Sequence, residues 1–290
     1  DPLSLPRLRL AAGDLGLSGR ATLTAEGTQA LTVAGRVQAE AGDLSRFSGL
    51  AGRSLAGAVA GEVSGRYDLL SGAGEVDARL IGTDVAPGDP RLDRALAGRS
   101  EIMLSAARDT AGLDLRSLSV SAGPLALEAG GRIATGDTAV SARLALSDLG
   151  RIDPAWSGAA RASADWRQEG GAARLTAEGT MDGFAMGIAE VDTILAGESR
   201  FSAVVSGPAD ALWVERVLLD APGLDLTMTG AGETGARRLT AEAELADLGQ
   251  LVPEFPGPVR LSGTARETAG GVTLDLSGTG PGGTEARVAG

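Results

Sequence analysis

Apolar residues recur at every second position along most of this chain. Near the start, Leu15, Leu17, Ala21, Leu23 and Ala25 alternate with Gly, Ser, Arg and Thr. A period of two is that of a β-strand, whose successive side chains point to opposite faces of a sheet. The pattern therefore predicts half-buried strands, each with one apolar face. The predicted strands cover residues 8–10, 15–17, 21–25, 31–37, 59–63, 76–80, 102–104, 113–115, 118–120, 125–127, 140–146, 175–177, 201–205, 212–214, 217–219, 224–228, 239–245, 259–261 and 272–276.

Glycine-rich segments lie between many of these strands, at 130–131, 170–171, 230–235 and 270–271. Glycine tolerates the backbone angles of tight turns. Short glycine turns between alternating strands are typical of antiparallel hairpins.

One kind of segment that interrupts the alternation follows an Asp-Leu pair, at 43–54, 148–158 and 247–257. Asp is a favourable helix N-cap. Pro154 and Pro253 limit any helix in the later two segments to about one turn. We therefore predict a very short helix after each Asp-Leu pair.

A second kind of interruption lies at 90–98 and 188–197. Each segment is apolar on one side and closes with a glycine, which predicts a small helix with a glycine C-cap. We expect both kinds of helix to cover the edge or the end of a sheet, because bare edges favour aggregation.

The sequence also repeats itself. ARLALSDLG at 142–150 returns as AEAELADLG at 241–249, which is 99 positions later, and DRALAGRS at 93–100 returns as DTILAGES at 192–199 with the same offset. A fixed offset with matching apolar positions is the mark of a repeat architecture.

An earlier, partial copy starts near Arg36, where Asp43 stands for Asp148 at an offset of 105. We predict approximate repeat units at 1–141, 142–240 and 241–290, the last of them incomplete. Because repeats stack on their neighbours, we expect residues 1–290 to form one continuous body.

Composition indicates how the apolar faces are used. The chain has 44 Gly but only 3 Trp, 1 Tyr and 4 Phe, so Leu, Val and Ala must supply the apolar surface. Two sheets could pack face to face and seal an ordinary core, or one long sheet could curl around a trough that stays partly open. The scarcity of large rings favours the second arrangement. The predicted fold class is all-β with a few short helices, an elongated antiparallel sheet curled into a taco-like trough with an apolar interior.

The charge and the missing residue types exclude several functions. The net charge of −12 argues against a nucleic-acid partner and against docking on an anionic lipid surface. The chain has no Cys and no His, and its 26 basic residues are all Arg, so thiolate, imidazole and lysine chemistry are absent. Two G-x-G-x-x-G stretches, at 230–235 and 278–283, lack the strand and helix context of a dinucleotide site. We predict that the protein is not an enzyme and holds no cofactor and no metal.

Three stretches carry a resemblance to a known family. They are DLSRFSGLAGRSLAGAVAGEVSGRYD (43–68), LAGRSEIMLSA (96–106) and LSVSAGPLALEAGG (118–131). Degenerate strands with this Asp-Leu and Leu-Ala-Gly punctuation resemble the TamB family and the related AsmA-like proteins of Gram-negative envelopes. The resemblance covers most of the chain and contains no catalytic motif.

The resemblance implies a periplasmic protein. Members of that family are anchored in the inner membrane and cross the periplasm as a long curled sheet, whose interior carries phospholipids between the inner and outer membranes. The implied partners are phospholipid acyl chains, an outer-membrane barrel protein of the TamA type, and an inner-membrane anchor that another part of the chain supplies. Because the sequence begins at Asp1 rather than at Met, we expect a fragment or a processed product of such a protein.

The residues expected to line the lipid groove are the Leu and Val residues on the apolar side of the predicted strands. They are Leu15, Leu17, Leu23, Val33, Val76, Leu80, Leu115, Val120, Leu125, Leu127, Leu144, Leu146, Leu175, Val205, Val214, Leu219, Leu224, Leu226, Leu245, Leu261 and Leu274.

Two other functions remain open at this point. The chain could be an interaction module whose free sheet edge receives strands of an outer-membrane protein during assembly, by β-augmentation. It could also be a structural β-solenoid, such as a stalk, although a stalk should seal its interior with bulkier side chains.

Overall fold

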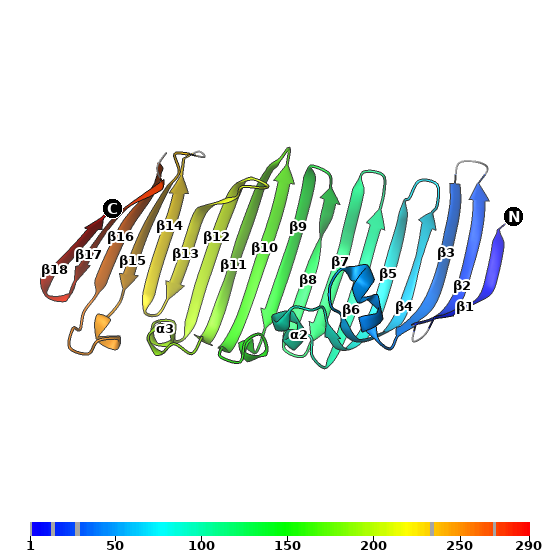
Figure 1. Cartoon of the computed structure of the whole chain (residues 1–290), viewed down its shortest axis with the longest axis horizontal. Coiled ribbons are helices and arrows are strands. Elements are labelled where there is room, and N and C mark those ends of the chain that lie inside the picture. Colours follow the sequence, from blue (N-terminus) through cyan, green and yellow to red (C-terminus); the bar gives the residue numbers. More distant parts are fainter. Residues whose placement is uncertain (1, 13–14, 27–29, 233–234, 269–270) are drawn as a thin grey trace. The chain divides into compact units, whose positions relative to one another are not determined.

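A computed structural model describes residues 2–12, 15–26, 30–232, 235–268 and 271–290. The chain divides into two compact units, Asp1–Leu146 and Ser147–Gly290. Within each unit, the described strands pair antiparallel with their neighbours in the sequence, so each unit is a β-meander with short helices between some strands (Figure 1). The prediction of an all-β, antiparallel fold with a few short helices is confirmed.

The first unit runs from β1 to β9. Its elements are β1 (Leu3–Ala12), β2 (Leu15–Glu26), β3 (Ala30–Ala41), η1 (Leu44–Phe47), α1 (Ser48–Ala51), β4 (Ala56–Asp68), β5 (Gly74–Ala86), α2 (Pro90–Ala95), β6 (Arg99–Arg108), β7 (Gly112–Ala122), β8 (Leu125–Ala134) and β9 (Asp137–Leu146).

The second unit runs from the short helix η2 to β18. Its elements are η2 (Leu149–Arg151), β10 (Ser157–Glu169), β11 (Ala172–Ala185), α3 (Ala189–Ile194), β12 (Glu198–Pro208), β13 (Trp213–Ala221), β14 (Leu224–Ala231), β15 (Arg238–Leu245), η3 (Leu248–Gln250), β16 (Val259–Thr268), β17 (Gly271–Gly280), η4 (Pro281–Gly283) and β18 (Thr284–Ala289).

The offset of 99 residues in the sequence is also an offset between structural elements. Helix α2 begins at Pro90 and α3 at Ala189, and η2 begins at Leu149 and η3 at Leu248. Each of these short helices therefore returns at the equivalent place between strands, followed by the equivalent strand.

Asp84 and Gly183 illustrate this equivalence at the level of the backbone. Both have positive φ angles, of 49° and 58°. The N–H of each donates to the carbonyl oxygen of the glycine that follows the helix, Gly98 at 2.8 Å and Gly197 at 3.0 Å. The two copies thus close the loop around α2 and α3 in the same way.

The very short helices after the Asp-Leu pairs are confirmed. Asp43, Asp148 and Asp247 are the N-caps of η1, η2 and η3, and each carboxylate accepts a hydrogen bond of 2.9 Å from a backbone N–H two residues later. The bonds satisfy backbone donors that have no partner inside the helix.

The glycine C-caps predicted for the other two helices are wrong by two positions. The C-cap residue of α2 is Leu96 and that of α3 is Leu195. Gly98 and Gly197 lie two residues after these C-caps. Their φ angles of 90° and 106° show that these glycines instead turn the chain into the next strand.

One predicted turn is confirmed and one is wrong. Gly170 and Gly171 connect β10 and β11 with φ angles of 55° and 91°, as a tight hairpin turn requires. Gly130 and Gly131, in contrast, lie inside β8, where Gly131 pairs with Leu115 and Val140. The predicted turns at 230–235 and 270–271 lie partly outside the described residues.

Two pairs of predicted strands are single strands with a bulge. Residues 113–115 and 118–120 both belong to β7, where Ser117 pairs with Ser105 and Leu115 with Ala106, so Arg116 is an extra residue. Residues 213–214 and 217–219 likewise belong to the single strand β13, and residue 212 directly precedes it. Glu215 is the extra residue there, because Arg216 pairs with Val204 and Val214 with Val205. A bulge shifts the alternation by one residue, which is why the pattern appeared to stop and restart.

The alternation pattern missed two strands. The side of β10 that pairs with Met181 and Ala177 of β11 carries Ala160, Ala162 and Ala164 in place of Leu or Val, so its apolar signal is weak. Strand β18 is only 6 residues long and lies next to glycines. None of the helices in the described part of the chain combines the length and the apolar composition that a membrane span requires.

Candidate functional site

The strand pairings bring the apolar residues of the first unit to one face of its sheet. Residues that pair directly across antiparallel strands share a face. Leu17 pairs with Leu10 and with Ala39, and Leu127 pairs with Val120 and with Leu144. We call this side the first apolar face. In β2, β3, β8 and the part of β4 from Val59 onward, the odd-numbered residues lie on this face. In β6, β9 and the part of β5 up to Gly82, the even-numbered residues lie on it. Strand β1 contributes Leu3, Leu5, Leu8 and Leu10, and β7 contributes Leu113, Leu115, Leu118, Val120 and Ala122.

The same pairing logic defines a second apolar face in the second unit. Leu175 pairs with Val205, which pairs with Val214. In β11, β12, β15 and β16, the odd-numbered residues lie on this face. In β14, β17, β18 and the part of β10 from Ala160 onward, the even-numbered residues lie on it. Strand β13 contributes Val214, Val217, Leu219 and Ala221.

Every residue expected to line a groove lies on the apolar face of its unit. The first apolar face carries Leu15, Leu17, Leu23, Val33, Val76, Leu80, Leu115, Val120, Leu125, Leu127, Leu144 and Leu146. The second apolar face carries Leu175, Val205, Val214, Leu219, Leu224, Leu226, Leu245, Leu261 and Leu274. The structure thus brings the two sets together within their own units.

Several large residues of these faces were missing from that set. Tyr67 lies on the first apolar face, and Trp166, Phe201 and Met228 lie on the second. They follow the same alternation, but the residues expected to line the groove were restricted to Leu and Val. Including aromatic residues and Met at alternating positions would have found them.

The opposite face of each sheet is polar and carries cross-strand ion pairs. In the first unit, Glu75 lies 3.1 Å from Arg66 and 3.2 Å from Arg116. In the second, Arg174 lies 2.7 Å from Glu215. Sheets with one apolar and one charged face keep the charged face in water.

Large side chains on the apolar faces remain exposed to solvent. On the first face Leu10 is 53% exposed, and on the second face Leu261 is 55% and Val288 is 63% exposed. Among the described residues, the buried apolar residues of the first face are Ala106, Ala122, Leu125 and Leu146, of which the last three share a row with Ser100. A sealed core would bury most of the Leu and Val residues of the face.

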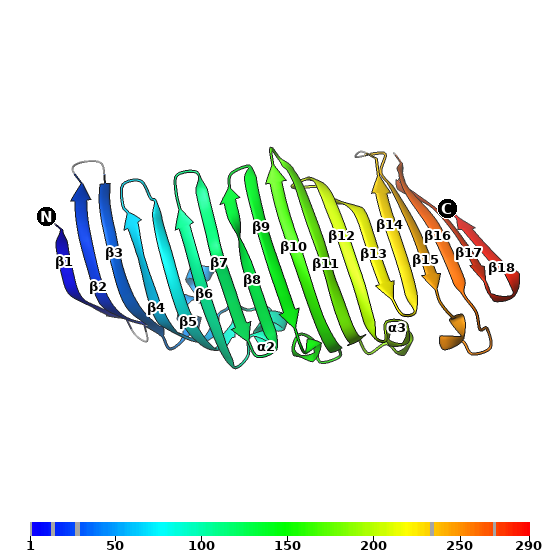
Figure 2. The same ribbon diagram turned by 180° about the vertical axis from the view of Figure 1, so that it is seen from behind.

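Each apolar face contains a hollow. On the first face a hollow of about 430 Å³ is lined by Leu8, Val33, Val63, Val76 and Leu113, which come from strands β1 to β7. On the second face a hollow of about 370 Å³ is lined by Ala241, Ala243, Leu261, Leu276 and Val288, from β15 to β18. The reverse view of the ribbon shows the same strands from the other side of each sheet (Figure 2).

Two serines on the apolar faces are buried. Ser100 is 1% exposed and Ser199 is 0% exposed, and neither hydroxyl has a hydrogen-bond partner among the described residues. They occupy equivalent positions, at the start of β6 and β12, 99 residues apart. Serine's small volume suits the tight packing there, since a Cβ placed on the facing Gly82 would lie 2.3 Å from the Ser100 hydroxyl oxygen.

Two carboxylates at the start of α2, Asp89 and Asp93, accept hydrogen bonds from the backbone. Asp89 is the N-cap of α2 and accepts hydrogen bonds from the N–H groups of Arg91 and Leu92, which hold the pKa of its carboxyl below its usual value. Asp93 accepts a bond from the Gly88 N–H at 2.9 Å. Among the described residues, no group of acidic side chains is placed to hold a metal ion.

The glycine-rich stretches do not form a phosphate loop. Residues 230–235, of which 233–234 lie outside the described part, connect the antiparallel strands β14 and β15. Residues 278–283 include the end of β17 and the short helix η4, before β18. Neither stretch opens a helix between parallel strands, as the dinucleotide-binding fingerprint requires.

Comparisons with known proteins add no further identification: no family model, no curated protein and no solved structure matches this chain.

Proposed function

We propose that the two apolar faces bind phospholipid acyl chains, and that the chain is a periplasmic segment of a TamB-like conduit between the inner and outer membranes. The observation that supports this proposal is the predominantly apolar face of each unit, with large Leu and Val side chains left in contact with solvent. Exposed apolar surface of this extent is typical of a binding site.

The energetics of such a face suit a carrier. Each methylene group transferred from water to an apolar surface gains about 0.8 kcal/mol. A row of Leu, Val and Ala residues offers many sites of nearly equal free energy, so an acyl chain can move along the face without crossing a large barrier. The headgroup can stay in water at the edge of the sheet.

The geometry that would complete the carrier is a curled sheet. We propose that each sheet bends with its apolar face inward, as a taco-like trough. The hollow on the first apolar face supports this, because its lining includes both Leu8 of β1 and Leu113 of β7. In a flat sheet these strands would lie about 29 Å apart, at roughly 4.8 Å per strand.

The partners follow from the same proposal. An outer-membrane barrel protein of the TamA type would receive the distal end of the conduit, and an inner-membrane anchor would be supplied outside these residues. Neither partner is required for the acyl-chain binding that the apolar faces support.

A second candidate function is strand addition at a sheet edge. Strand β18 pairs with β17, and all of its residues are exposed. An exposed strand that is paired on one side only, within the described residues, can accept a further strand by β-augmentation. A sealed stalk is less well supported, because large side chains on both apolar faces are exposed.

The adjacent residues Leu226 and Thr227 of β14 provide a direct test. Leu226 lies on the second apolar face between Leu219 and Ala243, whereas Thr227 lies on the opposite face between Leu218 and Glu242. We expect Leu226→Asp to reduce the phospholipid that copurifies with the protein by at least about five-fold, because a carboxylate is costly beside an acyl chain. Thr227→Asp should leave it near the wild-type amount.

The measurement is quantitative mass spectrometry of lipid per protein, with circular dichroism to confirm that both variants are folded. Equal losses in the two folded variants, or no phospholipid on the wild-type protein, would contradict the proposal.

A further inference from the structure

Arg108 is a cation on a face that is otherwise apolar. At its end of the first apolar face, Tyr67 pairs with Gly74, Gly74 pairs with Arg108, and Arg108 pairs with Leu113. Among the paired positions of this face that the structure describes, the polar residues are Ser100, Arg108 and Thr138. Arg108 is therefore the charged residue among these three.

Gly74, which has no side chain, lies between Tyr67 and Arg108 across the paired strands. The two side chains come from strands about 10 Å apart, at roughly 4.8 Å per strand. A Cβ placed on Gly74 would lie 2.8 Å from Cδ2 of Tyr67, so the aromatic ring lies over this glycine. Tyr67 and Arg108 both line the 430 Å³ hollow, together with Val33 and Val76.

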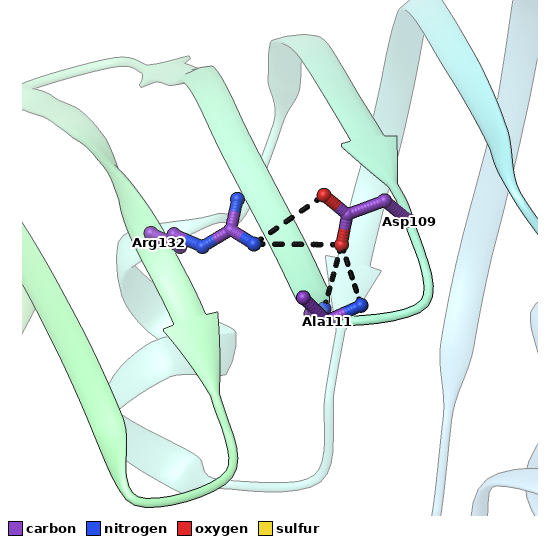
Figure 3. A network of polar contacts seen from close by, with 4 residues as sticks. Asp109, Ala111 and Arg132 are labelled. Atoms are coloured by element: carbon purple, nitrogen blue, oxygen red, sulfur yellow. Dashed lines mark hydrogen bonds and ion pairs between the residues drawn. The ribbon is translucent and has the colours of Figure 1, made fainter.

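The acidic residues around Arg108 are held by other groups. The carboxylate of Asp109 accepts hydrogen bonds of 2.8 Å from the N–H groups of Ala111 and Gly112, and Arg132 lies 3.3 Å from it (Figure 3). These contacts lower the pKa of Asp109, the backbone N–H groups most of all. Asp109 is thus fully ionised and its charge is already balanced.

Glu75 is engaged in the same way on the polar face. It forms ion pairs with Arg66 at 3.1 Å and with Arg116 at 3.2 Å. Asp68, which lines a neighbouring hollow with Arg108, accepts hydrogen bonds from the Ser71 hydroxyl and from the N–H groups of Leu31 and Leu70. Asp114 pairs with Arg132 across the strands. Arg108 itself makes no ion pair with a described residue, and its side chain is exposed.

The other copy of the repeat shows that the fold does not require this cation. The residue 99 positions after Arg108 is Gly207, which occupies the same place on β12. A Cβ on Gly207 would lie 3.1 Å from Cδ1 of Trp213, so an indole lies close to the space there. The arginine is therefore a feature of the first unit and not of the repeat.

We propose that Arg108 binds the phosphate headgroup of an anionic lipid whose acyl chain lies in the hollow of the first apolar face, with the Tyr67 hydroxyl as a second hydrogen-bond donor from the same hollow. This site rests on the proposed function, because it needs the apolar face to hold the chain. The guanidinium donates hydrogen bonds to phosphate oxygens at the solvent-exposed end of the strands. The hydrocarbon leads away from it over Val33 and Val76. An amphiphile bound there has one fixed headgroup position, which makes the first unit selective for lipid phosphate.

The test compares two lipids that differ only in the phosphate. Binding of 1-oleoyl-lysophosphatidate and of 1-mono-oleoylglycerol to the full chain is measured by calorimetry below their aggregation concentrations. We expect the phosphate to improve affinity by about five-fold, a modest value because the site is partly exposed. Arg108→Gln should remove that advantage and leave mono-oleoylglycerol binding unchanged. Tyr67→Phe should weaken only lysophosphatidate, by about two-fold.

Arg143 provides the matched control. It is an exposed arginine on the polar face, where it pairs with Glu128 across the strands. Arg143→Gln changes the net charge by the same amount and should leave both affinities unchanged. A loss of lysophosphatidate binding equal to that of Arg108→Gln would show a general charge effect and overturn the site.

The remaining outcomes separate this site from the proposed function. Equal binding of the two lipids, unaffected by Arg108→Gln, overturns the phosphate site alone. Binding of neither lipid overturns the proposed function and the site with it. Glycerol 3-phosphate should not bind measurably, since it lacks the chain, and tight binding of it would identify a free-phosphate site in place of a lipid site.

Discussion

At the scale of single residues, the two adjacent glycines of β8 have different roles. Gly131 has a φ of 143°, and a Cβ there would lie 2.1 Å from the Ala139 carbonyl oxygen of β9. The φ angle of Gly130 is not positive, and a Cβ placed there would have the Leu115 carbonyl oxygen as its nearest neighbour, at 3.3 Å. The sequence alone presented both as a turn, because glycine serves turns and close strand approach equally. Only the pairing partners distinguish the two.

Gly131→Ala should therefore destabilise the protein more than Gly130→Ala. We expect a loss of about 2 kcal/mol or more for Gly131→Ala, since β8 and β9 must separate to admit the methyl group, and under about 1 kcal/mol for Gly130→Ala. Urea unfolding of the two variants measures the difference. Equal losses would mean that β8 and β9 do not approach as closely as described.

Which residues share a face of the sheet could be predicted at this scale because the period of two is simple. Once Leu127 was assigned to one face, the parity of the residue number assigned its neighbours along the strand. The same parity places the predicted Leu and Val residues on the apolar faces. Arg108 could not be recognised in this way, because its significance depends on Tyr67 and Gly74, which are distant in the sequence.

At the scale of the elements, the bulges of β7 and β13 carry the same ion pair in opposite order. In the first unit Glu75 of β5 lies 3.2 Å from Arg116 at the bulge, and in the second Arg174 of β11 lies 2.7 Å from Glu215. These positions are 99 residues apart. Each pair spans the strand between its partners, so it fixes the bulge against the polar face.

Charge reversal tests whether the pair acts as a unit. Arg174→Glu alone should cost about 0.5 to 1 kcal/mol, because it places like charges together at a partly exposed site. The double variant Arg174→Glu with Glu215→Arg should recover most of that loss, since the first unit holds the reversed order. Urea unfolding of the single and double variants gives the coupling free energy, and strictly additive losses would rule out a coupled pair.

The cap of η3 predicts a pH dependence. Hydrogen bonds from the N–H groups of Gly257 and Gly249 lower the pKa of Asp247. A carboxyl with a folded-state pKa below its unfolded value of about 3.9 stabilises the fold above that pH, and this contribution is lost as the pH falls through the folded-state pKa.

Asp247→Ala should consequently lower the melting temperature at about pH 6 and have a smaller effect at about pH 2.5. Scanning calorimetry at the two pH values measures both differences. Asp210→Ala, in the exposed connection between β12 and β13, is the control and should show little effect at either pH. A deficit for Asp247→Ala that is the same at both pH values would refute the role of the ionised cap.

Elements with strong patterns were predicted well and weak ones were not. The Asp-capped helices were found because capping depends on one residue and its backbone neighbours. Strand β10 was missed because alanine carries little apolar signal. The bulges of β7 and β13 were missed because nothing in the local sequence distinguishes a bulge from a strand end.

At the scale of the whole molecule, each unit is a meander of neighbouring strands with one apolar face. Alternation and the repeat offset predicted the all-β antiparallel class. They could not predict how strongly each sheet curls, because curvature depends on twist and on bulges such as those at Arg116 and Glu215. The lipid-carrying function that we propose would depend on that curvature and on what contacts the apolar faces.

The central claim is that the apolar faces contact lipid, and β8 offers the most direct test. Leu127 lies on the first apolar face between Val120 and Leu144, while the adjacent Glu128 lies on the polar face between Ser119 and Arg143. A photocrosslinking amino acid is placed at each position in turn, and the products formed in cells are analysed for attached phospholipid. Phospholipid adducts at Leu127 and not at Glu128 are the predicted result. Equal adducts at both positions, or none at either in a folded protein, would contradict the account.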